Sequence, residues 1–413
     1  METIDDDVGI DWGSQTHQVC ILDGDGTVRG ERAFAHSGAS RADMADWILK
    51  TTGAEPETIG IAIEVPNGPV VETLLERGFG LHSLNPKQLD RFRDRVSPAG
   101  AQDDRRDARV LAAALRTDRA AFRHLDPATP EIIELREWSR MADHLTRDRT
   151  RLANRARQQL WRYDPQLLKV DSDLGKAWIR DLWTRVPTPA QAQTVRPASI
   201  TRLLKRHRIR RLDAAAVLEI LRAPAITVAP GTAPAATAHL RLVFAQLDLI
   251  GTQITEAHQQ IDRLITTRAE SEDPTGINTQ RDVDILSSLP GVGRTVLATL
   301  LAEAYDPLQR RDYQALRCLS GVAPVTRRSG KSLNVVRRLA AHNRLRCALH
   351  HWAAVAVQHD TVSQAKYRAL RDRGHGHARA LRSVADRLLA VACAMLETQT
   401  LFDPSRTGHN HAT

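Results

Sequence analysis

Residues 7–34 of this 413-residue chain, DVGIDWGSQTHQVCILDGDGTVRGERAF, decide the fold. Apolar and polar residues alternate through three short runs, which is the period of a half-buried strand. The pattern predicts strands at 8–12, 18–22 and 27–34, with a turn at DGDG, residues 23–26. The chain is therefore expected to begin with three consecutive strands.

The segments that follow alternate between helix and strand. RADMADWILKTTG, residues 41–53, predicts a helix that ends at its glycine, and TIGIAIEVP, residues 58–66, predicts a buried strand. A helix beginning near Asn67, a short strand at LHSLNP (81–86) and a helix through DDRRDARVLAAALRTD (103–118) complete the series. The order βββαβαβα predicts a mixed sheet with helices packed against it.

The composition favours an acidic partner. The chain has 58 Lys+Arg against 49 Asp+Glu, a net charge of +9, and nucleic acid is a natural partner for such a balance. Its four cysteines are scattered without a CxxC pair, so neither a zinc site nor a disulfide framework is indicated. The N-terminus METIDDDVG lacks an apolar core, and no run of about 18 apolar residues occurs. We therefore expect a soluble, cytoplasmic protein with no membrane partner.

The middle of the chain is predicted to be helical. Residues 131–162 carry apolar residues at 3,4 spacing and arginines on the other face. A second series at this spacing is typical of a coiled-coil seam and is formed by Leu240, Val243, Leu247, Ile250, Ile254, Ala257, Ile261 and Leu264. The two helices are expected to pair within one chain or between protomers. Between them lies an Arg-rich helical insert, about 166–238, with a Pro/Ala-rich linker around 223–238.

The character of the sequence changes again at residue 282. DILSSLPGVGRTVLATLLAEA predicts a helix-hairpin-helix, whose turn, with Gly291, Gly293 and Arg294, would let backbone N–H groups approach a phosphate. A mostly helical region to about 398 follows. The chain is accordingly divided into four predicted parts: an α/β RNase H-like domain at 1–125, coiled-coil helices with the insert at 126–270, a C-terminal domain at 280–398 and a disordered tail at 399–413.

Four carboxylates form the first candidate site. Asp11 and Glu64 lie where two predicted strands end, and Asp104 and Asp107 are three residues apart on one predicted helix, so they share a face. Such a set can hold two Mg²⁺ ions about 4 Å apart for phosphodiester chemistry, because hard cations take oxygen ligands. Asp103 is a rival to Asp104, since it also shares a face with Asp107.

RRSGKS, residues 327–332, is the second candidate site. It resembles the end of a P-loop, but Val325 stands where the first glycine of that motif would be, so this interpretation is rejected. The remaining possibilities are a phosphate-binding turn formed by Arg327, Arg328 and Lys331, or a nucleophilic serine, Ser329, activated by nearby cations.

The first strand and its turn also allow a different interpretation, in which the chain is an actin-like ATPase. GIDWGSQTHQVCILDGDG is similar to the first phosphate loop of actin-like sugar kinases. That fold also needs a second Asp-x-Gly strand-loop and an adenosine motif, and the sequence has neither. The basic, helical C-terminal half is also wrong for such a kinase.

Together these motifs resemble the transposases of the insertion-sequence-110 family, which are DEDD recombinases. The resemblance rests on GIDWGSQTH, IAIEVPNGP, DDRRDARVLA, the LPGVG region and LSGVAPVTRRSGKS with RLRCALHHWA, and it covers 7–165 and 240–395. It implies a RuvC-like N-terminal domain in which Asp11, Glu64, Asp104 and Asp107 bind Mg²⁺. It also implies a nucleophilic serine at Ser329, with Ser332 the weaker candidate. That serine would form a transient phosphoserine link to DNA.

The resemblance also implies partners. The family acts as an oligomer, a dimer or tetramer here, joined through the coiled coils, and a structured RNA guides the choice of target and donor DNA. Arg105, Arg106 and Arg109 project from other faces of the acid-bearing helix and would hold it against a nucleic-acid backbone. The function predicted is cutting and rejoining of DNA strands at an insertion sequence. A RuvC-like nuclease or Holliday junction resolvase that uses water, and a non-enzymatic nucleic-acid-binding protein, remain the alternatives.

Overall fold

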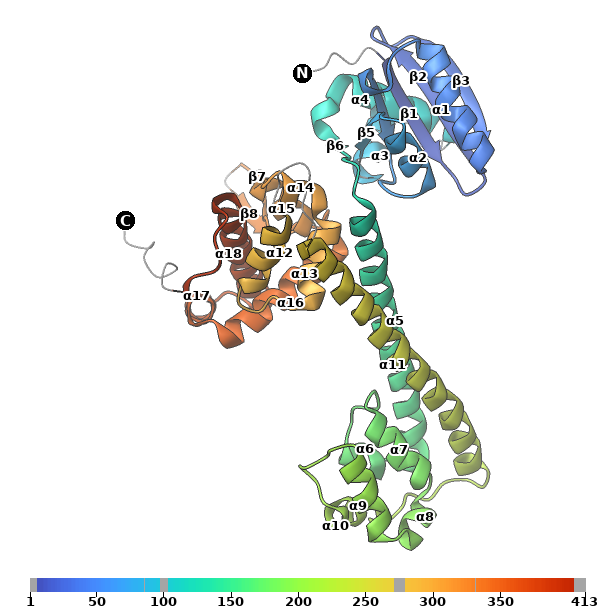
Figure 1. Cartoon of the computed structure of the whole chain (residues 1–413), viewed down its shortest axis with the longest axis vertical. Helices are drawn as coiled ribbons and strands as arrows, with labels where there is room; N and C mark the ends of the chain where they lie inside the picture. The colour runs from blue at the N-terminus through green and yellow to red at the C-terminus, as the bar shows by residue number, and fades with distance from the viewer. Residues whose placement is uncertain (1–5, 85, 97–102, 271–278, 331, 405–413) are drawn as a thin grey trace. The chain divides into compact units, whose positions relative to one another are not determined.

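The computed structural model describes residues 6–84, 86–96, 103–270, 279–330 and 332–404. The chain divides into two compact units, 1–129 and 130–413 (Figure 1). The first unit contains the predicted α/β region, and the second contains the helical middle and the C-terminal region.

The first unit is built on one mixed sheet, as the sequence predicted. Its strands are β1 (Asp6–Trp12), β2 (Thr16–Asp23), β3 (Val28–Ala35), β4 (Ile59–Ile63), β5 (Gly80–Ser83) and β6 (Arg123–His124). They lie in the order β3-β2-β1-β4-β5-β6. The first three strands are antiparallel, whereas β4 runs parallel to β1 and β5 runs parallel to β4. The short edge strand β6 was not predicted, because two exposed residues carry no periodic signal.

Helices cover both faces of this sheet. They are α1 (Gly38–Thr52), α2 (Pro69–Glu76), α3 (Pro86–Val96) and α4 (Asp104–Asp118), with 3₁₀ turns at Pro56–Thr58 and Arg119–Ala121. Buried apolar residues of α1 and α2 pack with Val8 and Ile10 of β1 on one face. Residues of α4 pack with Cys20 and Ala62 on the other face. The helix α3 was not predicted.

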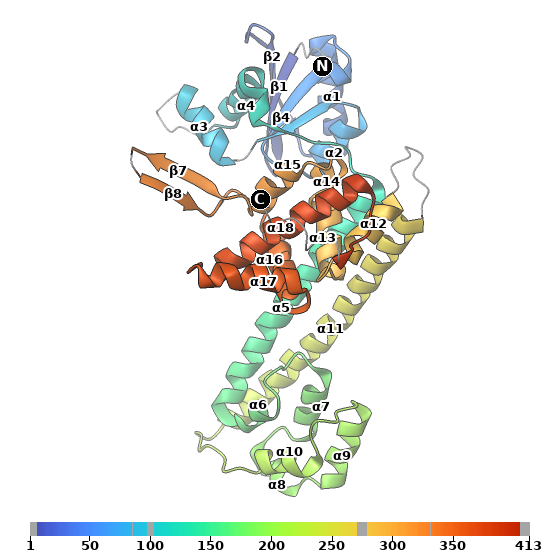
Figure 2. The same cartoon turned by 90° about the vertical axis from the view of Figure 1, so that its left-hand side faces the viewer.

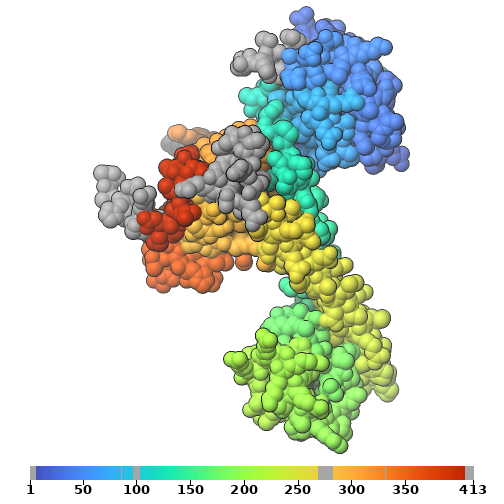
Figure 3. Space-filling view, viewed as in Figure 1, coloured from blue at the N-terminus to red at the C-terminus, as the bar shows by residue number. Residues whose placement is uncertain are grey.

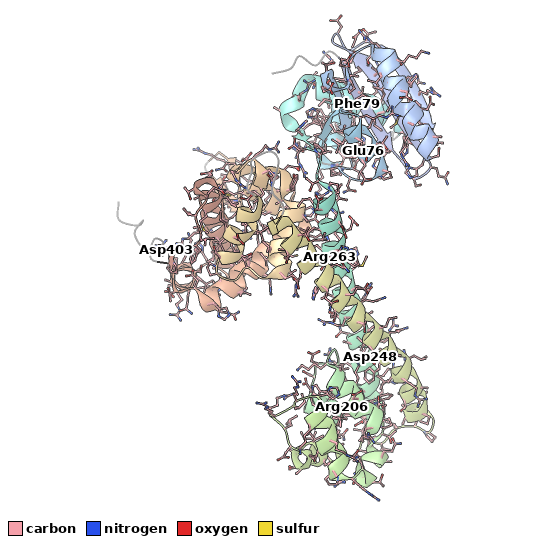
Figure 4. The ribbon with its side chains drawn as sticks, in the orientation of Figure 1. Glu76, Phe79, Arg206, Asp248, Arg263 and Asp403 are labelled. Atoms are coloured by element: carbon pink, nitrogen blue, oxygen red, sulfur yellow. The ribbon has the colours of Figure 1, made fainter. Side chains whose placement is uncertain are left out.

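Two long helices form the axis of the second unit. They are α5 (Pro130–Tyr163) and α11 (Thr232–Glu270), and they lie side by side (Figures 1 and 2). Every predicted seam residue of α11 is buried except Ile250, which is half-buried. α5 and α11 thus pair within this chain, which is one of the two arrangements that the sequence allowed. Arg263 of α11 contributes an ion pair to Glu134 of α5 at 3.5 Å (Figure 4).

The insert folds around the ends of these two helices (Figure 3). Its helices are α6 (Gln166–Val170), α7 (Ala177–Arg185), α8 (Pro189–Thr194), α9 (Pro197–Arg206) and α10 (Ala214–Leu221). A buried arginine ties it to α11, since Nε of Arg180 donates to Asp248 at 2.8 Å (Figure 4). The predicted Pro/Ala-rich linker is shorter than expected, because α11 already begins at Thr232.

The C-terminal region is helical with one exception. Its elements are α12 (Thr279–Ser288), α13 (Arg294–Glu303), α14 (Tyr305–Gln309), α15 (Tyr313–Ser320), β7 (Val325–Ser329), β8 (Ser332–Val336), α16 (Asn343–His359), α17 (Thr361–Asp372) and α18 (His377–Thr398). The hairpin β7–β8 was not predicted, and Figure 2 shows it extending away from the helices of this region. Among the described residues, no helix is both long and apolar enough to span a membrane.

Candidate active site

The central strand places the first acid. β1 lies between β2 and β4, and Asp11 is its penultimate residue. β4 runs parallel to β1 and ends at Ile63, so Glu64 follows at the same edge of the sheet. Carboxyl ends of neighbouring parallel strands form the crevice where α/β sheets bind ligands. Asp11 and Glu64 are both half-buried there.

Helix α4 brings the other two acids to this edge because it packs unusually close to β1. A Cβ at Gly9 would lie 1.9 Å from the carbonyl oxygen of Ala108 and 2.5 Å from the backbone nitrogen of Ala112. Only glycine permits such an approach. Since side chains alternate along a strand, Asp11 points to the same face as Gly9, toward the N-terminal turn of α4. That turn carries Asp104 and Asp107.

The electrostatics agree with this geometry. The pKa of Asp11 is raised from 3.8 to about 6, first by burial and then by the negative charges of Asp107, Asp104 and Glu64. Nearby negative charges disfavour the ionised form of Asp11. The rival acid Asp103 is not among the groups that shift this pKa. The charges of the other three predicted carboxylates thus act on Asp11.

An arginine that sequence reasoning missed also enters the site. Nε and Nη2 of Arg93, on α3, donate to the two carboxylate oxygens of buried Asp107, each at 2.7 Å. Nη1 of Arg93 binds Asp90 of its own helix at 2.7 Å. In the RFRDR run nothing marks Arg93 apart from its neighbouring arginines. Both oxygens of Asp107 are therefore engaged by a cation of the protein itself.

The donors suit a hard divalent cation, since all four are carboxylates and their mutual repulsion is relieved by positive charge. They are not drawn together around one point, however. Among the described residues, no three or more His, Cys, Asp or Glu side chains are arranged to hold a metal ion. Arg93 gives a physical reason. It is bound to Asp107, which is the carboxylate whose charge has the largest effect on the pKa of Asp11.

The opposite side of α4 is basic and hollow. A cavity of about 560 Å³ lies there. Its lining comes from α4, from Asp103 just before this helix, and from the β2–β3 region. The α4 residues are Arg105, Arg106, Arg109, Val110, Ala113 and Arg116, and the β2–β3 residues are Leu22, Gly26 and Glu31. Arg105 forms an ion pair with Glu31 of β3. Three of these arginines were predicted to contact nucleic acid, and Arg116 was not. Asp103 lies on this arginine side.

Ser329 lies in the second unit, at the tip of the hairpin. It is the last residue of β7 and is exposed, and it pairs across the turn with Ser332, the first residue of β8. Arg327 and Arg328 precede it on the same strand and are exposed. Lys331, predicted to bind phosphate, lies outside the described residues. The acids and Ser329 are thus in different units of the chain.

The segment for which the sequence predicted a helix-hairpin-helix contains α12 and α13. Gly291 has φ +81°, and a Cβ there would lie 2.8 Å from the backbone nitrogen of Ala356 in α16. This glycine therefore serves the packing of the turn against α16. Gly293 is exposed, with open space beside it. The guanidinium of Arg294 binds Asp262 of α11, with one N–O distance of 2.6 Å, so it is already paired.

Known proteins match the chain over both regions that carry candidate sites. Residues 8–165 match a family described as "Transposase", of the DEDD type. Residues 283–368 match the "Transposase IS116/IS110/IS902 family". The first match ends near the end of α5, and the second runs from α12 into α17.

Individual relatives extend over more of the chain. "Mini-circle putative transposase for IS117" from Streptomyces coelicolor is 30% identical over 407 residues, 96% of this chain and 95% of that protein. "Putative transposase y4uE" from Sinorhizobium fredii is 58% identical over 207 residues, but the match spans only 58% of its length. "Insertion element IS116 uncharacterized 44.8 kDa protein" from Streptomyces clavuligerus is 27% identical over 96% of both chains.

Proposed function

Because the chain belongs to the IS110 family of transposases, we propose that it cuts and rejoins DNA strands at the ends and target of an insertion sequence. The observation that supports this proposal is the position of Asp11 at the edge of the sheet, facing the turn of α4 that carries Asp104 and Asp107. Burial, and then the charges of Asp107, Asp104 and Glu64, raise the pKa of Asp11 to about 6, so a cation there would relieve an unfavourable charge.

Asp11, Glu64, Asp104 and Asp107 would hold two Mg²⁺ ions. When bound, such ions stabilise the attacking and the leaving oxygen of an in-line displacement at phosphorus. The carboxylate of Asp107 must first be released from its ion pair, since Arg93 donates to both of its oxygens. We propose that Arg93 leaves Asp107 when the metal enters and keeps its bond to Asp90 on α3.

Ser329 would supply the nucleophile. Its Oγ forms a bond to phosphorus while the bond from phosphorus to one sugar oxygen breaks, so a phosphodiester becomes a phosphoserine diester. The hydroxyl proton passes to a solvent base, and the leaving sugar oxygen takes up a proton. Attack by the sugar hydroxyl of a second strand reverses the exchange. The exposure of Ser329 at the tip of the hairpin supports this role.

Basic surfaces in both units would contact the nucleic acid. The arginine-lined hollow on α4 would receive the sugar-phosphate backbone, through Arg105, Arg106 and Arg109. In the second unit, the exposed turn at Gly293 would approach a phosphate, with Arg294 available only if it leaves Asp262. Following the family resemblance, we also propose a structured guide RNA and a homo-oligomer joined through coiled-coil helices.

A water-using RuvC-like nuclease is the second candidate. The acid set is complete within the first unit, and Ser329 belongs to the second. A nuclease of this kind would need Mg²⁺ and the acids but would leave no covalent adduct.

One experiment tests the proposal and separates the two candidates. The purified protein is mixed with Mg²⁺, DNA containing the element ends and target, and RNA transcribed from the element's flank. It is then denatured, digested and mapped by mass spectrometry for nucleotide-modified peptides. An adduct on Ser329 that is lost in Asp11→Ala is expected. Metal-dependent cleavage without an adduct supports the water-using nuclease instead.

A matched pair of variants tests the acid assignment. Asp104→Ala should reduce strand exchange by about 100-fold or more, because it removes a metal ligand. Asp103→Ala changes the adjacent residue, which lies on the arginine side of α4, and should keep activity within about 3-fold. Equal losses in the two variants would contradict the assignment.

A further inference from the structure

The β7–β8 hairpin has two chemically different faces. The strands pair in register, with Ser329 opposite Ser332 and Arg327 opposite Asn334. Successive side chains of a strand point to opposite faces, and directly opposed residues share a face. Ser329, Ser332, Arg327 and Asn334 therefore lie on one face, with Val325 and Val336 at its end away from the turn, and we call it the serine face.

The other face is formed by the residues between these positions. Arg328 lies opposite Leu333, and Thr326 lies opposite Val335. Leu333 and Val335 are 62% and 50% exposed, so this face presents two apolar side chains beside Arg328 and Thr326. Arg327 and Arg328 are adjacent in sequence and identical in charge, but the hairpin directs them to opposite sides.

The serine face carries the groups that bind a phosphodiester. Arg327 offers a planar fork of donors, and within the described part of the chain no ion pair joins it to a carboxylate that would compete with a phosphate. The side-chain amide of Asn334 donates to Oγ of Ser332 at 3.4 Å. This bond occupies a lone pair of Ser332 and leaves its O–H free to donate. Among the described residues, no such hydrogen bond reaches Oγ of Ser329, so this oxygen is free to act as the nucleophile.

We propose that the serine face is the phosphodiester-binding face of the hairpin, with Arg327, Asn334 and Ser332 holding the phosphate that Ser329 attacks. Arg327 binds a non-bridging oxygen and balances the charge that accumulates there during attack. Ser332 donates a hydrogen bond to the phosphate and is not the nucleophile. Arg328 has no part in this site. The inference rests on the proposed function, since it takes Ser329 as the attachment point.

The two arginines provide the test, because each is the matched control for the other. In Arg327→Ala, the yield of Ser329–DNA adduct should fall by about 10-fold or more, the loss expected for one charge-assisted hydrogen bond. In Arg328→Ala it should stay within about 3-fold, and Arg327→Lys should recover part of the yield. Equal losses in the two alanine variants, or a larger loss in Arg328→Ala, would overturn the inference.

A second readout does not depend on covalent chemistry. In a Ser329→Ala background, DNA affinity is compared by fluorescence anisotropy with and without each arginine substitution. We expect Arg327→Ala to weaken binding about 5-fold more than Arg328→Ala does. Equal affinities would refute the face assignment even if no adduct forms. An adduct on a residue other than Ser329 would instead refute the proposed function, so the two failures are distinguishable.

Discussion

Replacing Asp11 by Asn should stabilise the metal-free protein above about pH 6. The folded state raises the pKa of this carboxyl from 3.8 to about 6, so the folded protein holds the proton more tightly than the unfolded chain. The loss of folding free energy caused by ionised Asp11 is absent when this carboxyl is protonated. It grows as the pH rises from about 4 to about 6 and is constant above this interval. About two pH units at about 1.4 kcal/mol each give a ceiling near 3 kcal/mol. Because Asp11 is half-buried and coupled to other acids, we expect about 1–2 kcal/mol.

The assay is urea unfolding of full-length protein in EDTA, at about pH 4.5 and about pH 8, with fluorescence as the readout. Asp11→Asn should be more stable than the wild type only at the higher pH. Asp25→Asn, in an exposed turn of the same unit, is the control and should show no such difference. Added Mg²⁺ should stabilise the wild type more than Asp11→Asn. A variant that is less stable than the wild type at both pH values would refute the reasoning.

Three further substitutions test other contacts. Gly9→Ala should cost about 3 kcal/mol or more of stability, measured by thermal unfolding, because its Cβ would overlap the carbonyl oxygen of Ala108; an unchanged Tm would contradict the close packing of α4. Gly291→Ala should also lower the Tm, since φ is +81° there and the new Cβ would meet the backbone of α16. Arg93→Ala should destabilise the metal-free protein by about 3 kcal/mol by leaving Asp107 buried and unpaired, yet raise Mg²⁺ affinity in titration calorimetry. Weaker Mg²⁺ binding would mean that Arg93 instead orients the carboxylate for the metal.

The sheet of the first unit could be predicted because its strands keep a strict alternation. Val8 and Ile10 face one layer of helices, whereas Gly9 and Asp11 face the other. An acid at the end of such a strand is a candidate site residue that the sequence alone can indicate. The sequence does not reveal that Gly9 admits the backbone of α4, and this approach is what brings the helix acids to the strand acids.

Arg93 could not be predicted, because its partner is set by tertiary packing. The α3 sequence is dominated by charge, and its arginines at 91, 93 and 95 are alike in composition and neighbourhood. Only the folded chain shows that Arg93 meets Asp107, whereas Arg95 pairs with exposed Asp118. A bidentate contact depends on the angle between two helices, and no periodicity in the sequence encodes that angle.

The hairpin was missed for a different reason. The segments VTRRS and SLNVV lack the apolar alternation of a strand that packs on a core. Their turn has Gly330 at φ +54° but no Asn-Gly or Asp-Gly pair to announce it. Strand signals come mainly from burial, and this hairpin is largely exposed.

Because the hairpin is exposed, folding places little constraint on the residues at its tip. Within the described residues, β7 and β8 pair with one another and no other element packs extensively against them. A side chain at the tip can therefore be exchanged at little cost in folding free energy. A mutational scan there should be nearly flat for protein abundance and uneven for strand exchange. Sequence changes at the tip can therefore accumulate without loss of the core that carries the hairpin, so selection there acts on function and hardly on folding.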